Sequence, residues 1–371
     1  MTMTANPGLY VHIPFCTRKC PYCDFYSVPE LEKVDSYLER LALELRLERE
    51  RNAPFRERPF ASVFLGGGSP SVLSPAQILK LKDILSPLEI ASDAEFTLEA
   101  NPEDITAEKL AAWRALGVNR LSIGAQSLSP KGLSALGRRH TAKDTIRSVE
   151  SALESGFRTS IDLIFGWPGE TLEDLEFDLM AFLDLALDHL SLYALTLAPG
   201  TPLYLSLNSG LIANLPNEDD LAHLFLIAGE ILKNQGYHRY EVSNFARPGN
   251  ESSHNFKYWN RDPVMALGPA AHSFDGSVRS GNLSSLDGWM EALDAGGSYK
   301  EFTELLSTDL ERMERLFLGL RLQQGVALSD VIEGEKVNNL IEGGFLLKKL
   351  GRLLPTEKGF LNADYVAREL C

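Results

Sequence analysis

Three cysteines near the start of the chain have the spacing of metal ligands. Cys16, Cys20 and Cys23 form a C-x3-C-x2-C pattern within eight residues, whereas the fourth cysteine, Cys371, is the last residue of the sequence. Thiolate is the usual protein ligand of iron–sulfur clusters, and three thiolates can hold three irons of a cubic [4Fe–4S] cluster. The fourth iron would then lack protein sulfur and be open to an external ligand.

An open iron suggests a second cofactor. The amino and carboxylate groups of S-adenosylmethionine can bind such an iron, and an electron delivered there breaks a C–S bond and yields a 5′-deoxyadenosyl radical. A structural zinc loop is the alternative, with His12 completing a tetrahedron. The spacing favours the cluster, because zinc loops more often use two separated cysteine pairs. We expect Cys371 to be an incidental thiol.

The composition is that of an acidic globular protein. The 371 residues include 36 Lys and Arg against 51 Asp and Glu, which gives a formal net charge of −15. This balance argues against a broad nucleic-acid surface, because phosphate binding needs clustered cations. Residues Met1–Leu9 do not read as a signal peptide, and no apolar run of about 18 residues predicts a membrane helix. We therefore expect a cytoplasmic protein with reduced thiols.

The cysteines follow the first of six short β-branched or aromatic runs. Each run is followed by turn residues and a helical stretch, as in repeated βα units. The runs are Leu9–Ile13, Ala61–Leu65, Glu95–Ala100, Arg120–Gly124, Thr159–Ile164 and His189–Tyr193. Parallel strands with crossover helices follow, so the sequence predicts an α/β fold, either a doubly wound sheet or a barrel. In both, ligands gather at the carboxyl ends of the strands.

Helix start and stop signals separate these runs. Ser74 before Pro75 predicts a helix start, and Thr171 with Asp174 three residues later resembles a capping box. Gly117 stands where a helix should stop.

The pattern changes after Gly200. A helix is expected over Asp219–Asn234, whereas Tyr237–Asn282 is rich in aromatic, Asn, Ser, Gly and His residues and shows no clean periodicity. We expect that stretch to be loop-rich and functional. Helical spacing returns over Thr308–Leu322, which predicts a small helical or winged domain at the end of the chain.

The cysteine loop and its neighbours resemble a known superfamily. C-x3-C-x2-C with the aromatic Tyr22 before the last cysteine looks like the loop of radical S-adenosylmethionine proteins. The segments Tyr10–Cys16 and Cys23–Tyr26 resemble the branch that contains oxygen-independent coproporphyrinogen III dehydrogenase and the HemW-type haem chaperones. The resemblance implies a partial (β/α)6 barrel and a smaller, mainly helical C-terminal domain, with a winged-helix-like form as one option. It divides the chain into a barrel over 1–235, a loop-rich haem-motif region over 236–300 and the C-terminal domain over 301–371.

The resemblance also implies the S-adenosylmethionine contacts. Glycines after the second strand let the backbone approach a ligand closely. The residues that match the family's motif for the amino group of the methionyl moiety are Gly67, Gly68 and Ser69. Polar residues at later strand ends match other contacts, namely Glu99, Gln126, Arg138 and Asp162. Tyr10 and Tyr22 match positions near the cluster and adenine, with core packing as the alternative.

Two features separate the dehydrogenase from the chaperones. The dehydrogenase branch typically has a further cysteine two residues after the third, where this chain has Phe25. The chain also begins only fifteen residues before Cys16, without the long N-terminal extension of the dehydrogenase. Both features argue against decarboxylation of coproporphyrinogen III.

An aromatic segment points to haem. His254–Trp259 resembles the H-N-x-x-Y-W motif of the HemW type. A neutral imidazole can ligate haem iron, so the expected axial ligand is His254, with His272 as a second candidate. The alternative is that these aromatics only dock the C-terminal part onto the barrel.

These observations lead to one expected function. The resemblance implies a cytoplasmic haem chaperone that binds a [4Fe–4S] cluster, S-adenosylmethionine and haem and delivers haem to acceptor haemoproteins, respiratory ones among them. A dimer and peripheral contact with a membrane haemoprotein are compatible with it, and nucleic acid is not an expected partner. The alternative is a radical enzyme that resembles coproporphyrinogen III dehydrogenase.

Overall fold

The computed structural model describes residues 5–51, 53–212, 215–332 and 334–370. Cys371, which we expect to be an incidental thiol, lies outside the described residues. No helix in these ranges is long and apolar enough to cross a membrane.

Six parallel strands confirm the six predicted runs. They are β1 (Gly8–Ile13), β2 (Phe60–Gly67), β3 (Ile90–Ala100), β4 (Arg120–Gln126), β5 (Arg158–Phe165) and β6 (His189–Ala194). Each pairs in parallel with the next along the chain, so all six carboxyl ends lie at one edge of the sheet. β1 and β6 do not pair with each other, which leaves the barrel open as the resemblance implied.

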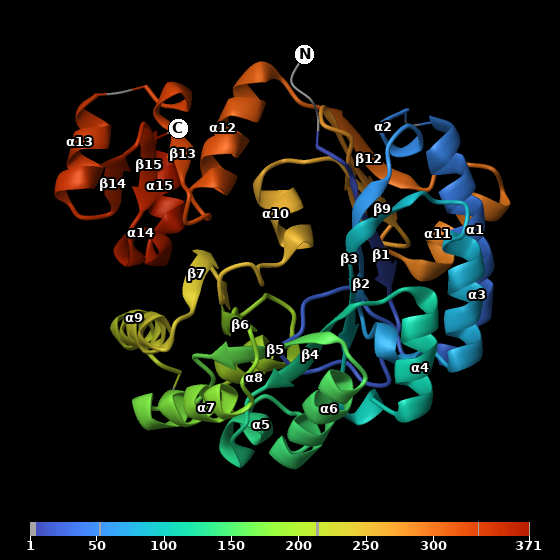
Figure 1. The fold of residues 1–371 in the computed structure, drawn as a ribbon, viewed down its shortest axis with the longest axis horizontal. Helices are drawn as coiled ribbons and strands as arrows, with labels where there is room; N and C mark the ends of the chain where they lie inside the picture. The colour runs from blue at the N-terminus through green and yellow to red at the C-terminus, as the bar shows by residue number, and fades with distance from the viewer. Residues whose placement is uncertain (1–4, 52, 213–214, 333, 371) are drawn as a thin grey trace.

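Crossover helices cover the outer face of this sheet (Figure 1). The helices are α1 (Val34–Arg51), α2 (Ala53–Arg56), α3 (Pro75–Leu85), α4 (Ala107–Leu116), α5 (Pro130–Ala135), α6 (Ala142–Glu154) and α7 (Leu172–Asp184). Short 3-10 turns precede α1, α3 and α4, at η1 (Leu31–Lys33), η2 (Pro70–Val72) and η3 (Pro102–Asp104). The main core fills the space between the sheet and these helices, where Leu9, Val11 and Ile13 of β1 are fully buried. Because side chains alternate along a strand, Tyr10 and His12 face the opposite, inner side.

The predicted helix signals are confirmed. Ser74 caps α3 in a capping box with Gln77, and Thr171 with Asp174 forms both bonds of a capping box at α7. Gly117 ends α4 in the left-handed conformation, with φ of 111°.

The stretch Tyr237–Asn282 differs from the expected loop-rich region. It contributes strands to both edges of the main sheet: β7 (His238–Glu241), β8 (Asn244–Ala246), β9 (Val264–Leu267), β10 (His272–Phe274) and β11 (Val278–Asn282), which β12 (Lys300–Leu305) extends. β8 pairs antiparallel with β6, and β9 pairs parallel with β1. These strands have only three to five residues within that stretch, too few for an alternating pattern to show.

Four further helices lie between β6 and β12 along the chain. They are α8 (Pro202–Asn208), α9 (Glu218–Asn234), α10 (Ser253–Trp259) and α11 (Leu286–Asp294). α9 confirms the predicted helix to within one residue at its start. Figure 1 places α10 between the sheet and the C-terminal helices, and α10 contacts both β2 and α12.

The end of the chain has its own small core. Its elements are α12 (Thr308–Gly319), β13 (Val326–Ala327), η4 (Leu328–Asp330), α13 (Glu335–Glu342), β14 (Leu346–Lys349), β15 (Arg352–Pro355), α14 (Glu357–Leu361) and α15 (Ala363–Leu370). The three strands form a separate antiparallel sheet, and Leu316, Leu346 and Val366 pack in a hydrophobic cluster separate from the main one. The predicted mainly helical C-terminal region is therefore confirmed, with a small sheet added.

Candidate functional site

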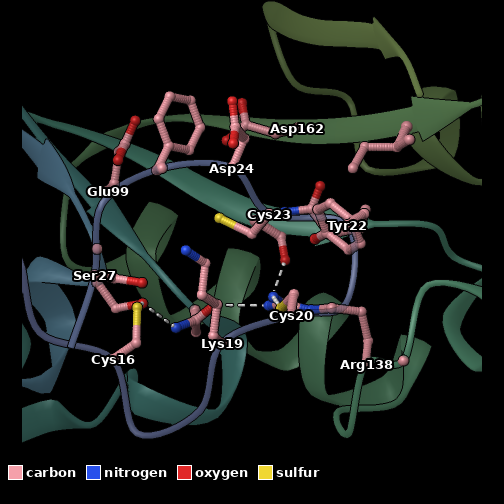
Figure 2. Close-up of a pocket in the computed structure, with 18 of the residues that line it drawn as sticks. Cys16, Lys19, Cys20, Tyr22, Cys23, Asp24, Ser27, Glu99, Arg138 and Asp162 are labelled. Atoms are coloured by element: carbon pink, nitrogen blue, oxygen red, sulfur yellow. Dashed lines mark hydrogen bonds between the residues drawn. The ribbon is translucent and has the colours of Figure 1, made fainter. Parts of the chain in front are cut away.

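The carboxyl edge of the sheet surrounds a cavity of about 550 Å³. The cavity is lined by residues from the loop after β1 and from the ends of β2 to β6, and Figure 2 shows their side chains around it. A volume of this order suits a small cofactor. The sequence-predicted residues that line it are Cys16, Cys20, Tyr22, Cys23, Gly67, Gly68, Ser69, Glu99, Gln126, Arg138 and Asp162.

The cysteine loop is held at its base by backbone bonds. Cys16 N–H donates to Val28 O at 3.0 Å, and Cys23 N–H donates to Cys20 O at 3.1 Å. All three cysteines are unpaired and half-buried. No three His, Cys, Asp or Glu side chains in the described ranges converge on a point where they could hold a single metal ion.

His12 is engaged in bonds that do not involve the cysteines. Its Nε2 lies 3.0 Å from Tyr26 O and its Nδ1 lies 3.2 Å from the Tyr10 hydroxyl. Burial lowers the pKa of His12 to about 4, which keeps the ring neutral at pH 7. His12 therefore holds Tyr26, which follows the cysteine loop, through its hydrogen bond to the Tyr26 carbonyl.

A chain of hydrogen bonds joins two of the cysteines. Arg138 donates from Nη1 to Cys20 Sγ at 3.1 Å and from Nη2 to Asn101 Oδ1 at 2.6 Å. Asn101 Nδ2 donates to Ser69 Oγ at 2.9 Å, and Ser69 Oγ lies 3.4 Å from Cys16 Sγ. The guanidinium thus places a permanent positive charge beside Cys20 Sγ, which suits the anionic sulfur of a cluster ligand.

Burial acts against ionisation of the other two cysteines. It raises the pKa of the Cys16 and Cys23 thiols, while the Ser69 hydroxyl and Arg138 act in the other direction at Cys16. Arg18, Lys19 and Arg139 also line the cavity, although the protein as a whole is acidic. The same lining contains the acidic residues Asp24, Glu99, Glu103 and Asp162, so the cavity offers cationic groups for a carboxylate or an anionic cluster and acidic groups for the ammonium or hydroxyls of a ligand.

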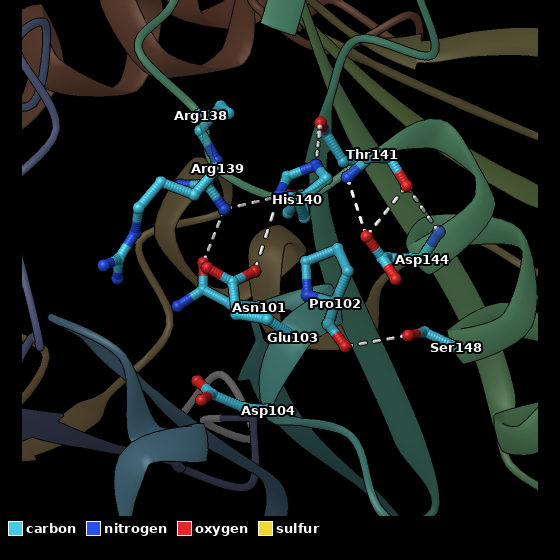
Figure 3. A network of polar contacts seen from close by, with 12 residues as sticks. Asn101, Pro102, Glu103, Asp104, Arg138, Arg139, His140, Thr141, Asp144 and Ser148 are labelled. Atoms are coloured by element: carbon cyan, nitrogen blue, oxygen red, sulfur yellow. Dashed lines mark hydrogen bonds and ion pairs between the residues drawn. The ribbon is translucent and has the colours of Figure 1, made fainter.

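A second network holds the segment that carries Arg138 (Figure 3). His140 is buried, with Nε2 3.0 Å from Ala125 O and Nδ1 3.4 Å from the Glu103 carboxylate. Ser148 of α6 donates to Pro102 O at 2.8 Å, which ties α6 to the turn after β3. These bonds hold the segment next to Arg138 in place, which fixes the position from which the guanidinium contacts Cys20.

The glycines after β2 form a close wall of the cavity. A Cβ on Gly68 would lie 2.7 Å from Phe15 O, and one on Gly67 would lie 2.6 Å from Nδ1 of His12. Gly67 also has φ of 108°, a conformation that L side chains rarely adopt. A side chain at Gly68 would therefore require the backbone before the cysteines to shift, and one at Gly67 would require the His12 ring to move.

Two carboxyl groups face the same cavity. Burial, with the nearby charge of Asp162, raises the pKa of Glu99 from 4.5 to about 8. Burial also raises the pKa of Asp162, which accepts a hydrogen bond from Ser122 Oγ at 2.9 Å. A pair of carboxyls with raised pKa values is suited to bind hydroxyl or ammonium groups of a ligand.

These pKa shifts predict a pH-dependent stability. Because the pKa of Glu99 is higher in the folded state, folding loses stability as the pH rises from about 5 to about 8. We expect Glu99→Gln to unfold with a free energy higher than that of the wild type by about 2 kcal/mol at pH 8 and by little at pH 5. Urea denaturation of the full chain without added S-adenosylmethionine measures this. Glu150→Gln on the exposed face of α6 is the control, and a pH-independent difference for Glu99→Gln would contradict the expectation.

The remaining predicted residues lie in different places. Tyr22 lies at the cavity and packs against Leu136, Ile164 and Trp167. Gln126 lies there in the left-handed conformation with φ of 65°, a strained position for a residue other than glycine. Tyr10 is not among the cavity residues; it stacks on Phe64 along the inner face of the sheet, at 6.2 Å between ring centroids.

Sequence reasoning missed several cavity residues, of which Asn101 and Tyr193 are two. Asn101 joins Arg138 to Ser69, and its position directly after β3 was the signal that could have identified it. Tyr193 lines the cavity from the end of β6, which the alternating strand pattern could have indicated.

His254 does not lie at the cavity. Its Nδ1 is 2.8 Å from Ser62 Oγ, its Nε2 is 3.2 Å from the Tyr258 hydroxyl, and its ring stacks on Phe64 at 5.1 Å. The side chain is buried, with 1% exposure. In this arrangement both ring nitrogens are hydrogen-bonded, so binding to iron requires one of these bonds to break.

Glu95 holds the helix that carries His254. Its carboxylate accepts from Ser252 Oγ at 3.1 Å and from the backbone N–H groups of Ser253 and His254 at 3.2 and 3.1 Å. Burial alone would raise the pKa of Glu95, but Arg120 and these N–H groups hold the pKa below its usual value. An ionised carboxylate thus caps the start of α10.

Comparisons with known proteins identify the family of this chain. Residues 10–181 match the Radical SAM superfamily. The chain is 36% identical to the protein named Heme chaperone HemW of Bacillus subtilis, over 95% of this chain and 92% of that protein. It is 37% identical to the mouse protein named Radical S-adenosyl methionine domain-containing protein 1, mitochondrial, over 87% and 75% of the two chains.

A solved structure gives the same fold. The coproporphyrinogen III oxidase HemN of Escherichia coli, described as a radical SAM enzyme, superposes with a TM-score of 0.85 and 25% identity over 98% of this chain and 90% of that one. Both the sequence and the fold therefore match over nearly the full length. The chain belongs to the radical SAM superfamily and, within it, to the HemW family.

Proposed function

We propose that this protein is a cytoplasmic haem chaperone that binds a [4Fe–4S] cluster and S-adenosylmethionine and delivers haem to acceptor haemoproteins, respiratory ones among them. The observation that carries the proposal is the near full-length similarity to proteins named haem chaperones, together with Phe25 two positions after the third cysteine. Phe25 lines the cavity and is 70% exposed. A phenyl group there offers no thiolate or proton to a substrate.

The cavity residues have distinct parts in this proposal. Cys16, Cys20 and Cys23 hold the cluster, and Arg138 stabilises the Cys20 thiolate through its 3.1 Å contact. When bound, the cluster and S-adenosylmethionine supply one-electron chemistry. Gly67, Gly68 and Ser69 receive the methionyl end of the cofactor, while Glu99, Gln126 and Asp162 bind its polar groups. Tyr22 packs beside the cluster.

Haem is the cargo in this proposal, and the ligand predicted from the sequence is His254. Its helix, α10, lies between the sheet and α12, so the H-N-x-x-Y-W segment joins the two parts of the chain. Ligation through Nε2 would require the Tyr258 hydroxyl to leave.

The second candidate is a radical enzyme that acts on coproporphyrinogen III. The structural similarity to HemN, with a TM-score of 0.85, favours it. The two candidates share the cluster and the cofactor cavity and differ in whether the tetrapyrrole is changed.

Haem titration tests the proposed function. Haem added to the full chain is expected to produce a Soret band distinct from that of free haem, because a protein imidazole replaces water at the iron. The band should saturate at about one equivalent of haem. A spectrum that remains that of free haem would remove the chaperone proposal.

Incubation with coproporphyrinogen III separates the two candidates. With reconstituted protein, reductant and S-adenosylmethionine, we expect no protoporphyrinogen above the level of a reaction without protein. Substantial turnover would establish the second candidate instead.

A further inference from the structure

A row of aromatic and imidazole side chains lies across the inner face of the sheet, from Phe64 on β2 to Phe302 on the edge strand β12. The register places Phe64 of β2 and Ala266 of β9 on either side of Tyr10. Further along, His272 of β10 lies opposite Gly281 of β11, which lies opposite Phe302 of β12. Facing residues in register point to the same side of a sheet. Since Leu9 and Val11 point into the core beneath the crossover helices, this row lies on the opposite, inner face, where α10 covers the Phe64 end through His254.

The rings of His272 and Phe302 contact each other over Gly281, which lies between them in the sheet. A Cβ on Gly281 would lie 2.3 Å from the Phe302 ring and 3.0 Å from Cδ2 of His272, so only glycine lets the two rings come together. Their centroids are 5.5 Å apart and their planes are at 84°. A phenyl ring held across an imidazole in this way can lie flat against a macrocycle whose iron the imidazole binds.

His272 is available to a ligand, whereas His12 and His254, the two other histidines close to this row, are not. His272 is exposed, and in the described ranges neither ring nitrogen has a hydrogen-bond partner. By contrast, His12 and His254 are buried with both nitrogens bonded. Partial burial and Arg279 lower the pKa of His272, so the imidazole is neutral at pH 7 and its lone pair is free.

The surface around His272 suits a flat apolar ligand. Phe302 is 38% exposed although it is a large aromatic residue, and it lies on the edge strand of the sheet. An exposed phenyl beside an exposed neutral imidazole combines flat apolar surface with a metal ligand, and a metalloporphyrin requires both.

We propose that His272 is an axial ligand of the haem iron and that the macrocycle lies on the sheet face formed by β10, β11 and β12, against Phe302. This inference rests on the proposed function, in that haem is the cargo. It differs from the sequence-based expectation, which gives the ligand role to His254. His254 then has a structural role, in which its contacts with Ser62 and Phe64 anchor α10 to β2.

Haem titration of variants of the full chain tests the inference. His272→Ala is expected to weaken haem binding about tenfold or more and to shift the Soret band, since the iron loses its nitrogen ligand. Free imidazole is expected to restore the band position in this variant, which a merely structural role would not allow. The matched control is His223→Ala, which removes an exposed histidine from the surface of α9 and is expected to behave as the wild type.

The outcomes distinguish the inference from the proposed function. A His272→Ala variant with wild-type affinity and Soret band would overturn the inference while leaving haem as the cargo. The same holds if a folded His254→Gln variant loses the band and imidazole restores it there alone. If the wild type itself shows no protein-specific Soret band, the proposed function fails. Far-UV circular dichroism confirms that each variant is folded.

Discussion

Cys20→Ser is expected to abolish the iron–sulfur cluster. A serine hydroxyl is a poor ligand for cluster iron, although it can still accept the hydrogen bond that Arg138 donates to Sγ at 3.1 Å. Anaerobically reconstituted wild type should contain about four irons and four sulfides per chain. We expect Cys20→Ser to contain less than about one tenth of that iron and to lack the visible charge-transfer absorbance.

Cys371→Ser is the matched control for this experiment. It removes the one cysteine outside the C-x3-C-x2-C pattern, so cluster content should be unchanged. Zinc at one equivalent without sulfide in the wild type would contradict the cluster and, with it, both candidate functions. Retention of full iron and sulfide in Cys20→Ser would show that this thiol is not a ligand.

Gly68→Ala is expected to weaken S-adenosylmethionine binding strongly. The added Cβ would lie 2.7 Å from Phe15 O and 2.9 Å from Ile13 O. Both atoms are backbone, so the strand end and the cysteine loop must move to make room. Overpacking of this kind costs about 1–3 kcal/mol, which corresponds to a loss of affinity of about five- to 150-fold if the strain falls on the bound state.

Isothermal titration of reconstituted protein with S-adenosylmethionine measures this effect. Gly288→Ala in α11 is the control, because a Cβ there would lie 3.5 Å from the nearest atom, at ordinary contact distance. The control should bind as the wild type. Equal affinity of Gly68→Ala and the wild type would mean that the cofactor does not approach this wall of the cavity.

The parts of the fold that depend on local pattern were predictable. Six buried parallel strands each form one hydrophobic run, and Ser74 and Thr171 bond to backbone groups only three residues away. Such features depend on residues adjacent in sequence, so the chain displays them directly. The short strands β7 to β11 lack this property, because their stability comes from pairing with β6 and β1.

The candidate site likewise contains residues that a local motif identifies and residues that only the tertiary structure brings together. The sequence by itself determined the three cysteines, their loop after β1 and the glycines after β2, because each is a motif within a few residues. Only the tertiary structure decided that Arg138 reaches Cys20 across 118 positions, and that Glu95 holds the start of α10 across 159. It also decided that His254 is buried and His272 exposed. The physical reason is that strand order and register bring distant residues together, and no local periodicity encodes which distant neighbours a side chain will meet.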